Sequence, residues 1–538
     1  MNLKKLFSFL LLLFFFHSIA LSQVQQEWVR RYPDTGSSSA SANAMVLDDS
    51  SNVYISGFSI INSQYNYCTI RYNTNGVQQW VAQYPGISGT GRWANSIALD
   101  KFSNVYVTGI SAHDFCTIKY NSNGVQQWVQ FYDGPSHGND EAERIAIDNA
   151  GNVYVSGYSD SAYLEFGYAT IKYSADGRQL WVRRYNGCCE TDVKGLIVDD
   201  SCNIYLTGVN NSRAVTIKYD SSGNQLWSQV FTGLGPPYAT GSNSIVIDGN
   251  YNVYITGYTN GNQTYSDYFL IKYSSTGVLQ FLRRFNADSL TNGSADGGKT
   301  IVLDNTGSIY IAGYAGGIYG SPYNFCTLKY SNTGDLIWVK RDIDTIGGGP
   351  INIVIDLNNN IFISGSASVF DPSVNTYRNA YELVMYNDSG IELSKQKYLS
   401  GSGDSFPYSI DLDKNNNIFE TGISGNSMAT IKYSQTSGLK KIAKPIPFDF
   451  ILYQNYPNPF NSETKIKFSI PRKINSAELT IYDILGKKVT SLNFKYINTG
   501  VYEVSLDASN FSSGVYYYRL TIIDSFYLSI TKKLVLLK

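Results

Sequence analysis

The sequence contains little histidine, which leaves few candidates for a metal site or a catalytic triad. Only three of its 538 residues are His, and His17 lies in an apolar segment near the N-terminus. His113 and His137 alone remain for a zinc site or a Ser-His-Asp triad. A Cys-x-x-Cys zinc pattern is absent, and no segment with the strand-to-helix pattern of a phosphate-binding loop or a nucleophile elbow is found. The sequence therefore predicts no catalytic residue, no metal site and no cofactor.

Proline and charged residues are also scarce, whereas tyrosine and glycine are abundant. The chain has 14 Pro, 16% charged residues, 44 Tyr and 47 Gly, which suits strands joined by tight turns. The formal net charge of −1 gives no reason to expect nucleic acid or an anionic membrane as a partner. Because the apolar residues follow no helical period, we expect an all-β protein.

The N-terminus has the parts of a secretory signal peptide. Lys4 and Lys5 precede an apolar run at 6–16, and the small residues Ala20 and Ser22 suit cleavage after Ser22. The run is too short to span a bilayer core of about 30 Å, and we find no later transmembrane segment. Residues 1–22 are therefore interpreted as a signal peptide.

The six cysteines of this exported chain fall into two groups. Cys68, Cys116 and Cys326 occupy the same place in three copies of a repeat, which is typical of small buried apolar residues. Cys188, Cys189 and Cys202 are closer in sequence, and whether two of them form a disulfide stays open.

A motif of the type Asn-Val-Tyr-Ile-Ser-Gly, first seen at 52–57, occurs eight times. Its closing glycines are about 50 residues apart, in the range of propeller blades. They are Gly57, Gly109, Gly157, Gly208, Gly257, Gly313, Gly365 and Gly422. A typical copy holds four strand-like runs: an apolar run ending in Asp, the glycine motif, a run like Thr-Ile-Lys-Tyr and a run that in most copies contains Trp. Four short antiparallel strands make one blade, so we expect residues 23–437 to form a β-propeller.

The eighth repeat lacks its fourth run. The chain passes from Tyr433 to a linker at 438–450, whereas residues 26–29 (Gln-Glu-Trp-Val) match the missing run and precede every other element. We expect this N-terminal strand to complete the last blade, which would remove two exposed sheet edges. This count gives eight four-stranded blades, and the degenerate copies after residue 365 leave seven open.

The repeats resemble the SBBP family of β-propeller repeats. The resemblance rests on the glycine motif, the Thr-Ile-Lys-Tyr run and the Gly-x-x-x-Trp pattern, over about residues 25–435. It implies a propeller fold and no particular activity. That family is named for seven blades, so a count of eight departs from it.

Residues 451–538 lack the repeat, and their alternating runs predict an Ig-like β-sandwich. The segment Gln-Asn-Tyr-Pro-Asn-Pro-Phe-Asn at 454–461 and later motifs resemble the type A sorting domain of the type IX (Por) secretion system of Bacteroidota. The motif residues are Asn455, Pro457, Pro459, Phe460, Gly514, Lys532 and Lys533. The resemblance implies handling by the type IX secretion machinery, removal of this domain, and a mature protein that is secreted or attached at the outer-membrane cell surface. An ordinary Ig-like binding module would leave the co-occurring motifs unexplained.

Two residue types recur in the repeat and allow two interpretations each. Asp413-x-Asn415-x-Asn417 is similar to the start of a calcium loop, but the Gly and Glu that such a loop needs are missing, so an Asx turn is simpler. The repeated tryptophans could stack on sugars, but their fixed place favours packing between blades. They are Trp28, Trp80, Trp128, Trp181, Trp227 and Trp338. Trp93 does not follow the pattern and is the better ligand candidate.

The connections between second and third strands and between repeats vary in length, for example 58–67, 84–94 and 366–380. In an up-and-down blade both sets lie on one face, and variable loops on a rigid scaffold commonly carry binding. The candidate ligand-binding residues are Trp93, Tyr65, Tyr163, Tyr265, Tyr323, Asp140 and Glu165. Aromatic and acidic residues suit a glycan or a protein ligand, so we expect a non-enzymatic binding or adhesion scaffold. An extracellular polysaccharide hydrolase or lyase, and a purely structural surface component, remain the alternatives.

Overall fold

The computed structural model describes most of the chain after the predicted signal peptide. The described ranges are 24–33, 39–86, 92–160, 166–187, 191–233, 239–261, 264–286, 295–316, 323–342, 347–400, 403–435, 440–443, 449–472, 474–497, 499–508, 511–524 and 527–538. They form two compact units, Val24–Ser434 and Gln435–Lys538. The regular elements in these ranges are strands, and none of the ranges contains a helix long and apolar enough to cross a membrane. Residues 1–22 lie outside the described residues.

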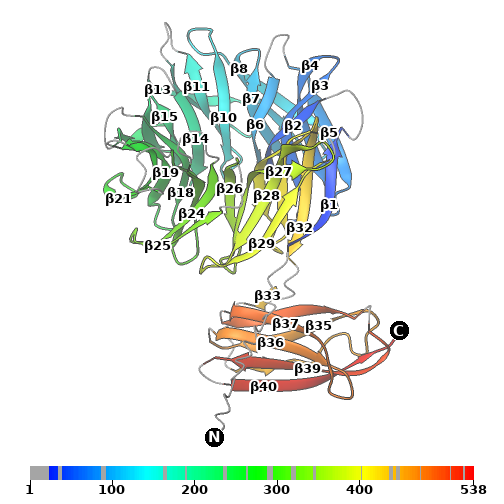
Figure 1. Ribbon diagram of the computed structural model, residues 1–538. Coiled ribbons are helices and arrows are strands. Elements are labelled where there is room, and N and C mark those ends of the chain that lie inside the picture. Colours follow the sequence, from blue (N-terminus) through cyan, green and yellow to red (C-terminus); the bar gives the residue numbers. More distant parts are fainter. Residues whose placement is uncertain are drawn as a thin grey trace. The chain divides into compact units, whose positions relative to one another are not determined.

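The first unit contains eight four-stranded sheets, numbered here 1 to 8 (Figure 1). Sheet 1 has β2 (Ala40–Leu47), β3 (Val53–Ile61), β4 (Gln64–Tyr72) and β5 (Gln78–Tyr84). Sheet 2 has β6 (Arg92–Leu99), β7 (Val105–Ser111), β8 (Asp114–Tyr120) and β9 (Gln126–Tyr132). Sheet 3 has β10 (Asp140–Ile147), β11 (Val153–Asp160), β12 (Phe166–Tyr173) and β13 (Gln179–Asn186). Sheet 4 has β14 (Thr191–Val198), β15 (Ile204–Asn210), β16 (Arg213–Tyr219) and β17 (Gln225–Phe231).

The remaining sheets of this unit follow the same plan. Sheet 5 has β18 (Thr240–Ile247), β19 (Val253–Gly261), β20 (Thr264–Tyr273) and β21 (Leu279–Phe285). Sheet 6 has β22 (Gly297–Leu303), β23 (Ile309–Ala315), β24 (Asn324–Tyr330) and β25 (Leu336–Asp342). Sheet 7 has β26 (Pro350–Ile355), β27 (Ile361–Asp371), β28 (Thr376–Tyr386) and β29 (Glu392–Tyr398). Sheet 8 has β30 (Ser405–Leu412), β31 (Ile418–Ser424), β32 (Ser427–Gln435) and, as its outer strand, β1 (Val24–Tyr32).

An aspartate holds the first turn of each sheet. In sheet 3 the carboxylate of Asp148 accepts hydrogen bonds from the backbone N–H groups of Ala150 and Asn152 (both 2.9 Å) and from the hydroxyl of Tyr154 (3.0 Å). The other seven aspartates accept the same two backbone bonds: Asp48, Asp100, Asp199, Asp248, Asp304, Asp356 and Asp413. The Asx-turn prediction is confirmed, because these carboxylates serve as acceptors for their own turns.

The glycine that closes each motif faces a bulge in the adjacent first strand. In sheet 3 the register of β10 shifts between Ala142 and Arg144, next to the pair that Ala142 makes with Gly157. A Cβ on Gly157 would lie 1.9 Å from the carbonyl oxygen of Glu141. The first strand of every other sheet has the same bulge. Only glycine leaves room for the bulged backbone, which explains why this residue recurs.

Neighbouring sheets are joined by apolar cores and by a repeated polar contact. The core between sheets 2 and 3 includes Tyr106, Val155 and Ile171. The indole N–H of Trp128 in β9 donates to the carbonyl oxygen of Ala175, in the last turn of sheet 3 (3.2 Å). The other repeated tryptophans donate in the same way to the next sheet: Trp28, Trp80, Trp181, Trp227 and Trp338. Packing between sheets is thus confirmed as the role of these side chains.

Sheet 8 takes its outer strand from the other end of the unit. Its strand order is β1-β32-β31-β30, so Val24–Tyr32 fills the place of the strand that is missing after Tyr433. Trp28 in β1 donates to the carbonyl oxygen of Thr74 in sheet 1 (3.2 Å). It also shares an apolar cluster with Phe419 of sheet 8 and Ile55 of sheet 1. Sheets 8 and 1 therefore meet through the same kinds of contact as consecutive sheets.

The described cysteines are not paired with one another. Cys68, Cys116 and Cys326 are free and buried, as expected, and burial raises the pKa of each thiol to about 12. Cys202 is free and half-buried. Cys188 and Cys189, the other members of the suspected disulfide group, lie outside the described residues.

The second unit has two four-stranded antiparallel sheets around one core. One contains β33 (Lys440–Ala443), β34 (Ile451–Leu452), β35 (Glu463–Ile470) and β38 (Gly500–Asp507). The other contains β36 (Ile474–Tyr482), β37 (Lys488–Ile497), β39 (Gly514–Ile523) and β40 (Tyr527–Leu536). Ile466 and Phe468 of the first sheet and Leu479 and Tyr518 of the second lie in the same apolar cluster, so the two sheets pack face to face.

Candidate functional site on sheets 2 and 3

The structure places several of the predicted binding residues on strands. Trp93 is the second residue of β6, Asp140 the first of β10 and Tyr65 the second of β4. The expectation that 58–67 and 366–380 are loops is wrong. Antiparallel pairing in the first of these continues to Ile61 and Gln64, because a two-residue turn is enough to join strands that remain hydrogen-bonded to their ends.

Trp93 is held beside the carboxylate of Glu141, on the first strand of the next sheet. Its indole N–H donates to Oε1 of Glu141 (3.2 Å), which also accepts from Nδ2 of Asn95 (2.7 Å). The hydroxyl of Tyr158 donates to Oε2 (3.4 Å). Burial and the charge of Glu141 raise the pKa of Tyr158, so this hydroxyl stays protonated. The half-buried indole of Trp93 is therefore fixed in orientation between two sheets.

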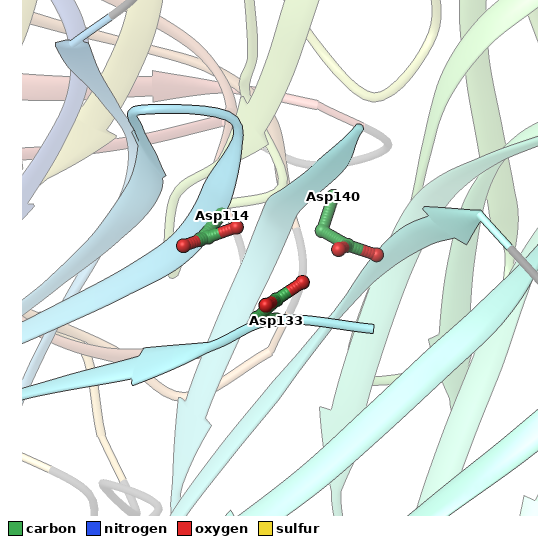
Figure 2. Close-up of side chains that lie close together, drawn as sticks. All are labelled: Asp114, Asp133 and Asp140. Carbon is green, nitrogen blue, oxygen red and sulfur yellow. The ribbon is translucent and has the colours of Figure 1, made fainter. Parts of the chain in front are cut away.

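Three aspartates gather next to this contact. Asp114 begins β8, Asp133 directly follows β9 and Asp140 begins β10. One carboxylate oxygen from each lies within 4.8 Å of the others, and Figure 2 shows the three side chains around one space. Asp140 is buried, Asp114 half-buried and Asp133 exposed. The backbone N–H of Gly134 donates to Oδ2 of Asp140 (2.7 Å). The cluster thus joins sheet 2 to sheet 3.

The electrostatics of the cluster are those of crowded negative charges. Burial, and then the charges of Asp133 and Asp140, raise the pKa of Asp114. Burial also raises the pKa of Asp140. Nδ1 of His137 lies 2.5 Å from Oδ2 of Asp133, and this hydrogen bond raises the pKa of the exposed imidazole. Oxygen ligands of this kind suit a hard divalent cation, and a histidine within reach does not change that preference.

Three exposed aromatic pairs lie at the hairpins between second and third strands. Tyr65 packs on Phe58 in sheet 1 and Tyr323 on Tyr314 beside β24 in sheet 6, with ring centroids 5.2 Å apart in both pairs. Phe370 and Tyr377 form the third pair, in sheet 7, at 5.5 Å. Tyr65 is 42% exposed and Tyr323 46%. Each pair therefore presents a ring whose orientation is restricted by its neighbour.

The predicted residues are only partly brought together. Trp93 contacts Glu141, the chain neighbour of Asp140, whereas Tyr65 and Tyr323 lie on other sheets. Tyr265 is in β20, but its side chain lies outside the described residues, as do Tyr163 and Glu165.

Sequence reasoning did not single out Asp114 and Asp133. Phe115 and Tyr132 pair in the register of β8 and β9, and the two aspartates directly flank this pair. The alignment of the Thr-Ile-Lys-Tyr and Trp runs could therefore have predicted their proximity.

The sorting motif holds the last strand of the second unit. The buried side chain of Asn455 donates from Nδ2 to Oγ1 of Thr464 (2.9 Å). The backbone N–H of the buried Phe460 donates to the carbonyl oxygen of Val535 (3.0 Å). Nε2 of Gln454 donates to the carbonyl oxygen of Lys533 (2.7 Å). The motif at 454–461 is thus a structural clasp around β40.

Other motif residues are left at the surface. Pro457, Pro459 and Lys533 are exposed and Lys532 is half-buried, whereas Gly514 begins β39 and pairs with Leu536. The surface residues of the motif are therefore accessible for recognition, while Asn455 and Phe460 have structural contacts.

Two family models match separate parts of the chain. The model described as a secretion system C-terminal sorting domain matches residues 454–537, the unit in which the clasp surrounds β40. The model described as a beta-propeller repeat matches residues 79–115, 134–164 and 227–262. This is a β-propeller repeat protein with a C-terminal secretion sorting domain. The sorting domain of this β-propeller repeat protein indicates export by the type IX secretion system, to the cell surface or beyond it.

Solved structures similar to the β-propeller repeat protein are remote from it. A protein of unknown function from Bacteroides caccae has 10% identity over 51% of this chain and 83% of its own, with a TM-score of 0.30. A fungal alcohol oxidase of the AA5 family, in complex with copper, has 11% identity over 96% of this chain and 100% of its own, with a TM-score of 0.38. An ulvan lyase of family PL25 has 12% identity over 62% of this chain and 90% of its own, with a TM-score of 0.41. These values carry no argument about activity. No curated protein sequence matches the chain.

Proposed function

We propose that this β-propeller repeat protein is a non-enzymatic binding or adhesion protein of the cell surface, and that its ligand is a glycan or a protein. The proposal rests on a set of aromatic rings that are partly exposed, are held in a fixed orientation and lie at or beside the start of a strand. Trp93 is fixed by Glu141, and Tyr65 and Tyr323 are each backed by a second ring. Flat apolar rings beside carboxylates can stack on sugar rings and accept hydrogen bonds from hydroxyl groups.

We further propose that the eight sheets are the blades of one closed propeller, at 23–437. The contact of Trp28 with sheet 1 supports closure by the N-terminal strand. The two packed sheets support an Ig-like sandwich at 451–538, and the predicted linker at 438–450 adds the edge strand β33 (Lys440–Ala443) to it. Residues 1–22 would be the signal peptide of a protein from a member of the Bacteroidota. A rigid ring of this kind would keep aromatic side chains of different blades at fixed separations.

The alternative is a polysaccharide hydrolase or lyase, and one observation favours it. Asp114 has a raised pKa and lies near a second carboxylate, Asp133, which resembles a general acid beside a nucleophile. Against it, Asp140 has no exposed surface, and Asp133 is already bonded to His137. Three carboxylates so close together leave little room for the anomeric carbon of a sugar, so binding is the better-supported function.

Affinity electrophoresis of the full chain, through native gels that each contain one soluble polysaccharide, tests the proposed function. We expect at least one polysaccharide to retard the protein, and Trp93→Ala and Tyr65→Ala to reduce the retardation. Phe102→Ala is the matched control, because Phe102 is 70% exposed but lies in the turn between the first two strands of sheet 2, at their other end.

Equal mobility in every gel would reject the glycan ligand and favour a protein partner or a structural role. Equal loss of retardation in Phe102→Ala and Trp93→Ala would reject the proposed face. Release of reducing sugars or unsaturated products from a retarding polysaccharide would favour the enzyme instead.

A further inference from the structure

The three aspartates between sheets 2 and 3 can be compared with a matching place elsewhere in the same chain. The backbone N–H of Asp140 donates to the carbonyl oxygen of His113, the residue before Asp114, at 2.7 Å. The N–H of Asp296 donates to the carbonyl oxygen of Ser266, the residue before Asp267, at 2.7 Å. Asp267 and Asp296, between sheets 5 and 6, are therefore the counterparts of Asp114 and Asp140.

The counterpart is neutralised by an arginine. Arg284 forms an ion pair with the buried Asp267. In the strand register Arg284 lies opposite Phe269, and the corresponding residue of sheet 2, opposite Cys116, is Phe131. The place that holds a guanidinium between sheets 5 and 6 thus holds an uncharged ring between sheets 2 and 3.

The cluster between sheets 2 and 3 also has one carboxylate more. Phe285 and Tyr132 occupy equivalent register positions, and the residues that follow them are Asn286 and Asp133. Among the described residues, no lysine or arginine forms an ion pair with Asp114, Asp133 or Asp140. The guanidinium of Arg184 donates to the hydroxyl of Tyr132 and to Oγ of Ser159 instead (3.0 and 2.7 Å). Compared with its counterpart, the cluster between sheets 2 and 3 therefore lacks one positively charged side chain and has one negatively charged side chain more.

Asp140 supplies the second, independent observation. Its side chain has no exposed surface, and its hydrogen-bond donors are neutral groups, the backbone N–H of Gly134 and the hydroxyl of Ser159. The segment that follows β9 closes over it, since a Cβ on Gly134 would lie 2.6 Å from Oδ1. Burying a carboxylate without a paired cation is strongly unfavourable, which points to a cation bound there.

We propose that Asp114, Asp133 and Asp140 bind one calcium ion, which joins sheet 2 to sheet 3 and supplies the positive charge that Arg284 supplies to Asp267 in the counterpart. The spacing fits such an ion. Two oxygens on opposite sides of calcium, each at 2.3–2.6 Å, are about 4.6–5.2 Å apart, and the three carboxylate oxygens lie within 4.8 Å of one another. The solvent-facing side, where Asp133 is exposed, leaves room for water ligands.

The donor set favours calcium over other cations. It contains carboxylate oxygens from three separate strand ends, an irregular arrangement that calcium tolerates and magnesium does not. Thiolate is absent among these ligands. Of the two imidazoles nearby, that of His137 is bonded to Asp133, and that of His113 acts on Asp114 through its charge, so the donor set is three carboxylates and not the usual zinc ligands. The inference is independent of the proposed glycan ligand, because the aspartates join two sheets whether or not a sugar binds.

Isothermal titration of the EDTA-treated, dialysed full chain with CaCl2 tests the site, together with the melting temperature with and without CaCl2. We expect one site, with a dissociation constant of about 10⁻⁴–10⁻³ M as in extracellular calcium modules, and a melting temperature that rises with calcium. Asp133→Asn, at an exposed position, should weaken binding at least about tenfold without loss of folding. Asp140→Asn should abolish binding. Asp176→Asn, an exposed aspartate in the last turn of sheet 3, is the control and should bind as the native chain does.

A fourth variant tests the internal comparison. Phe131→Arg places a guanidinium where the counterpart has Arg284, so we expect calcium binding to fall and the melting temperature to become independent of calcium. The proposal is overturned if the native chain shows no saturable binding, or if Asp133→Asn binds calcium as tightly as Asp176→Asn. Magnesium binding of equal affinity, with the same dependence on Asp133, would overturn the assignment of calcium.

Discussion

The first prediction concerns the contact between sheets 8 and 1, which Trp28→Ala would remove. Trp28 is 9% exposed, packs against Tyr72 and Phe419, and donates its indole N–H to Thr74. It belongs to the N-terminal strand, whereas its acceptor lies in sheet 1. If the ring is closed, this side chain stabilises the whole first unit and not just β1.

The magnitude follows from the burial of this side chain. About 200 Å² of indole surface, nine-tenths of it buried, contributes about 4.5 kcal/mol at about 25 cal/mol per Å², and the hydrogen bond adds about 1 kcal/mol. Trp→Ala changes in protein cores cost about 3–5 kcal/mol, so we expect a loss of about 4 kcal/mol. Trp28→Phe should cost less, about 1–2 kcal/mol, because only the N–H and part of the ring are lost. The native chain already has a Phe at the equivalent place in sheet 5. There Phe281 lies against Gly334, the turn glycine of the next sheet.

Urea unfolding followed by circular dichroism measures both variants against Trp128→Ala, the same change at the contact between sheets 2 and 3. We expect the losses for Trp28 and Trp128 to agree within about 1 kcal/mol. A loss below about 1 kcal/mol for Trp28→Ala, beside a full loss for Trp128→Ala, would refute the reasoning. It would mean that β1 detaches locally and does not tie sheet 8 to sheet 1.

Three further predictions concern single sites. Gly157→Ala should cost more than about 3 kcal/mol in urea unfolding, because its Cβ would lie 1.9 Å from a carbonyl oxygen, whereas Gly249→Ala, with nothing within 4 Å, should be nearly neutral; equal losses would contradict the bulge argument. Asp148→Ala should cost about 1–3 kcal/mol at pH 7. Burial alone would raise the pKa of Asp148, but the hydrogen bonds from its turn lower it below the usual value. The ionised carboxylate therefore stabilises the fold above the usual pKa of an aspartate, and this contribution is lost as the pH falls below that value. The difference from the native chain should shrink at about pH 3, and a constant difference in urea unfolding at both pH values would refute this. Phe460→Ala, at a 3% exposed residue of the second unit, should lower that unit's transition by calorimetry and leave the first unit's transition unchanged; a shift of both would contradict separate units.

Much of the fold could be predicted from local pattern. The Asp that ends each first run, the Gly that closes each second run and the Trp found in six of the eight fourth runs occupy the roles expected of a turn, a strand and a sheet contact. The N-terminal run with Trp28 was expected to complete the last repeat, and the strand order of sheet 8 has β1 in that place. These features were predictable because turn chemistry and strand alternation act within a few residues.

The candidate site was less predictable. Asp140 and Trp93 were singled out, but as loop residues, and the strand pairing that holds them was not foreseen. Asp114 and Asp133 were not singled out, because neither belongs to a repeated motif and only the pairing of β8 with β9 places them together. The burial of Asp140 and the absence of a paired arginine depend on register and packing, which the sequence does not display.

The sequence by itself determined that this protein is a β-repeat chain followed by a secretion sorting domain, because both are encoded in short motifs at regular or characteristic spacing. Only the tertiary structure decided which carboxylates meet. The charge at such a place depends on strand pairing within a sheet and on the packing of the next sheet. In sheet 5 the pairing of β20 with β21 brings Arg284 to Asp267, whereas Asp140 of sheet 3 meets Asp114 and Asp133 of sheet 2.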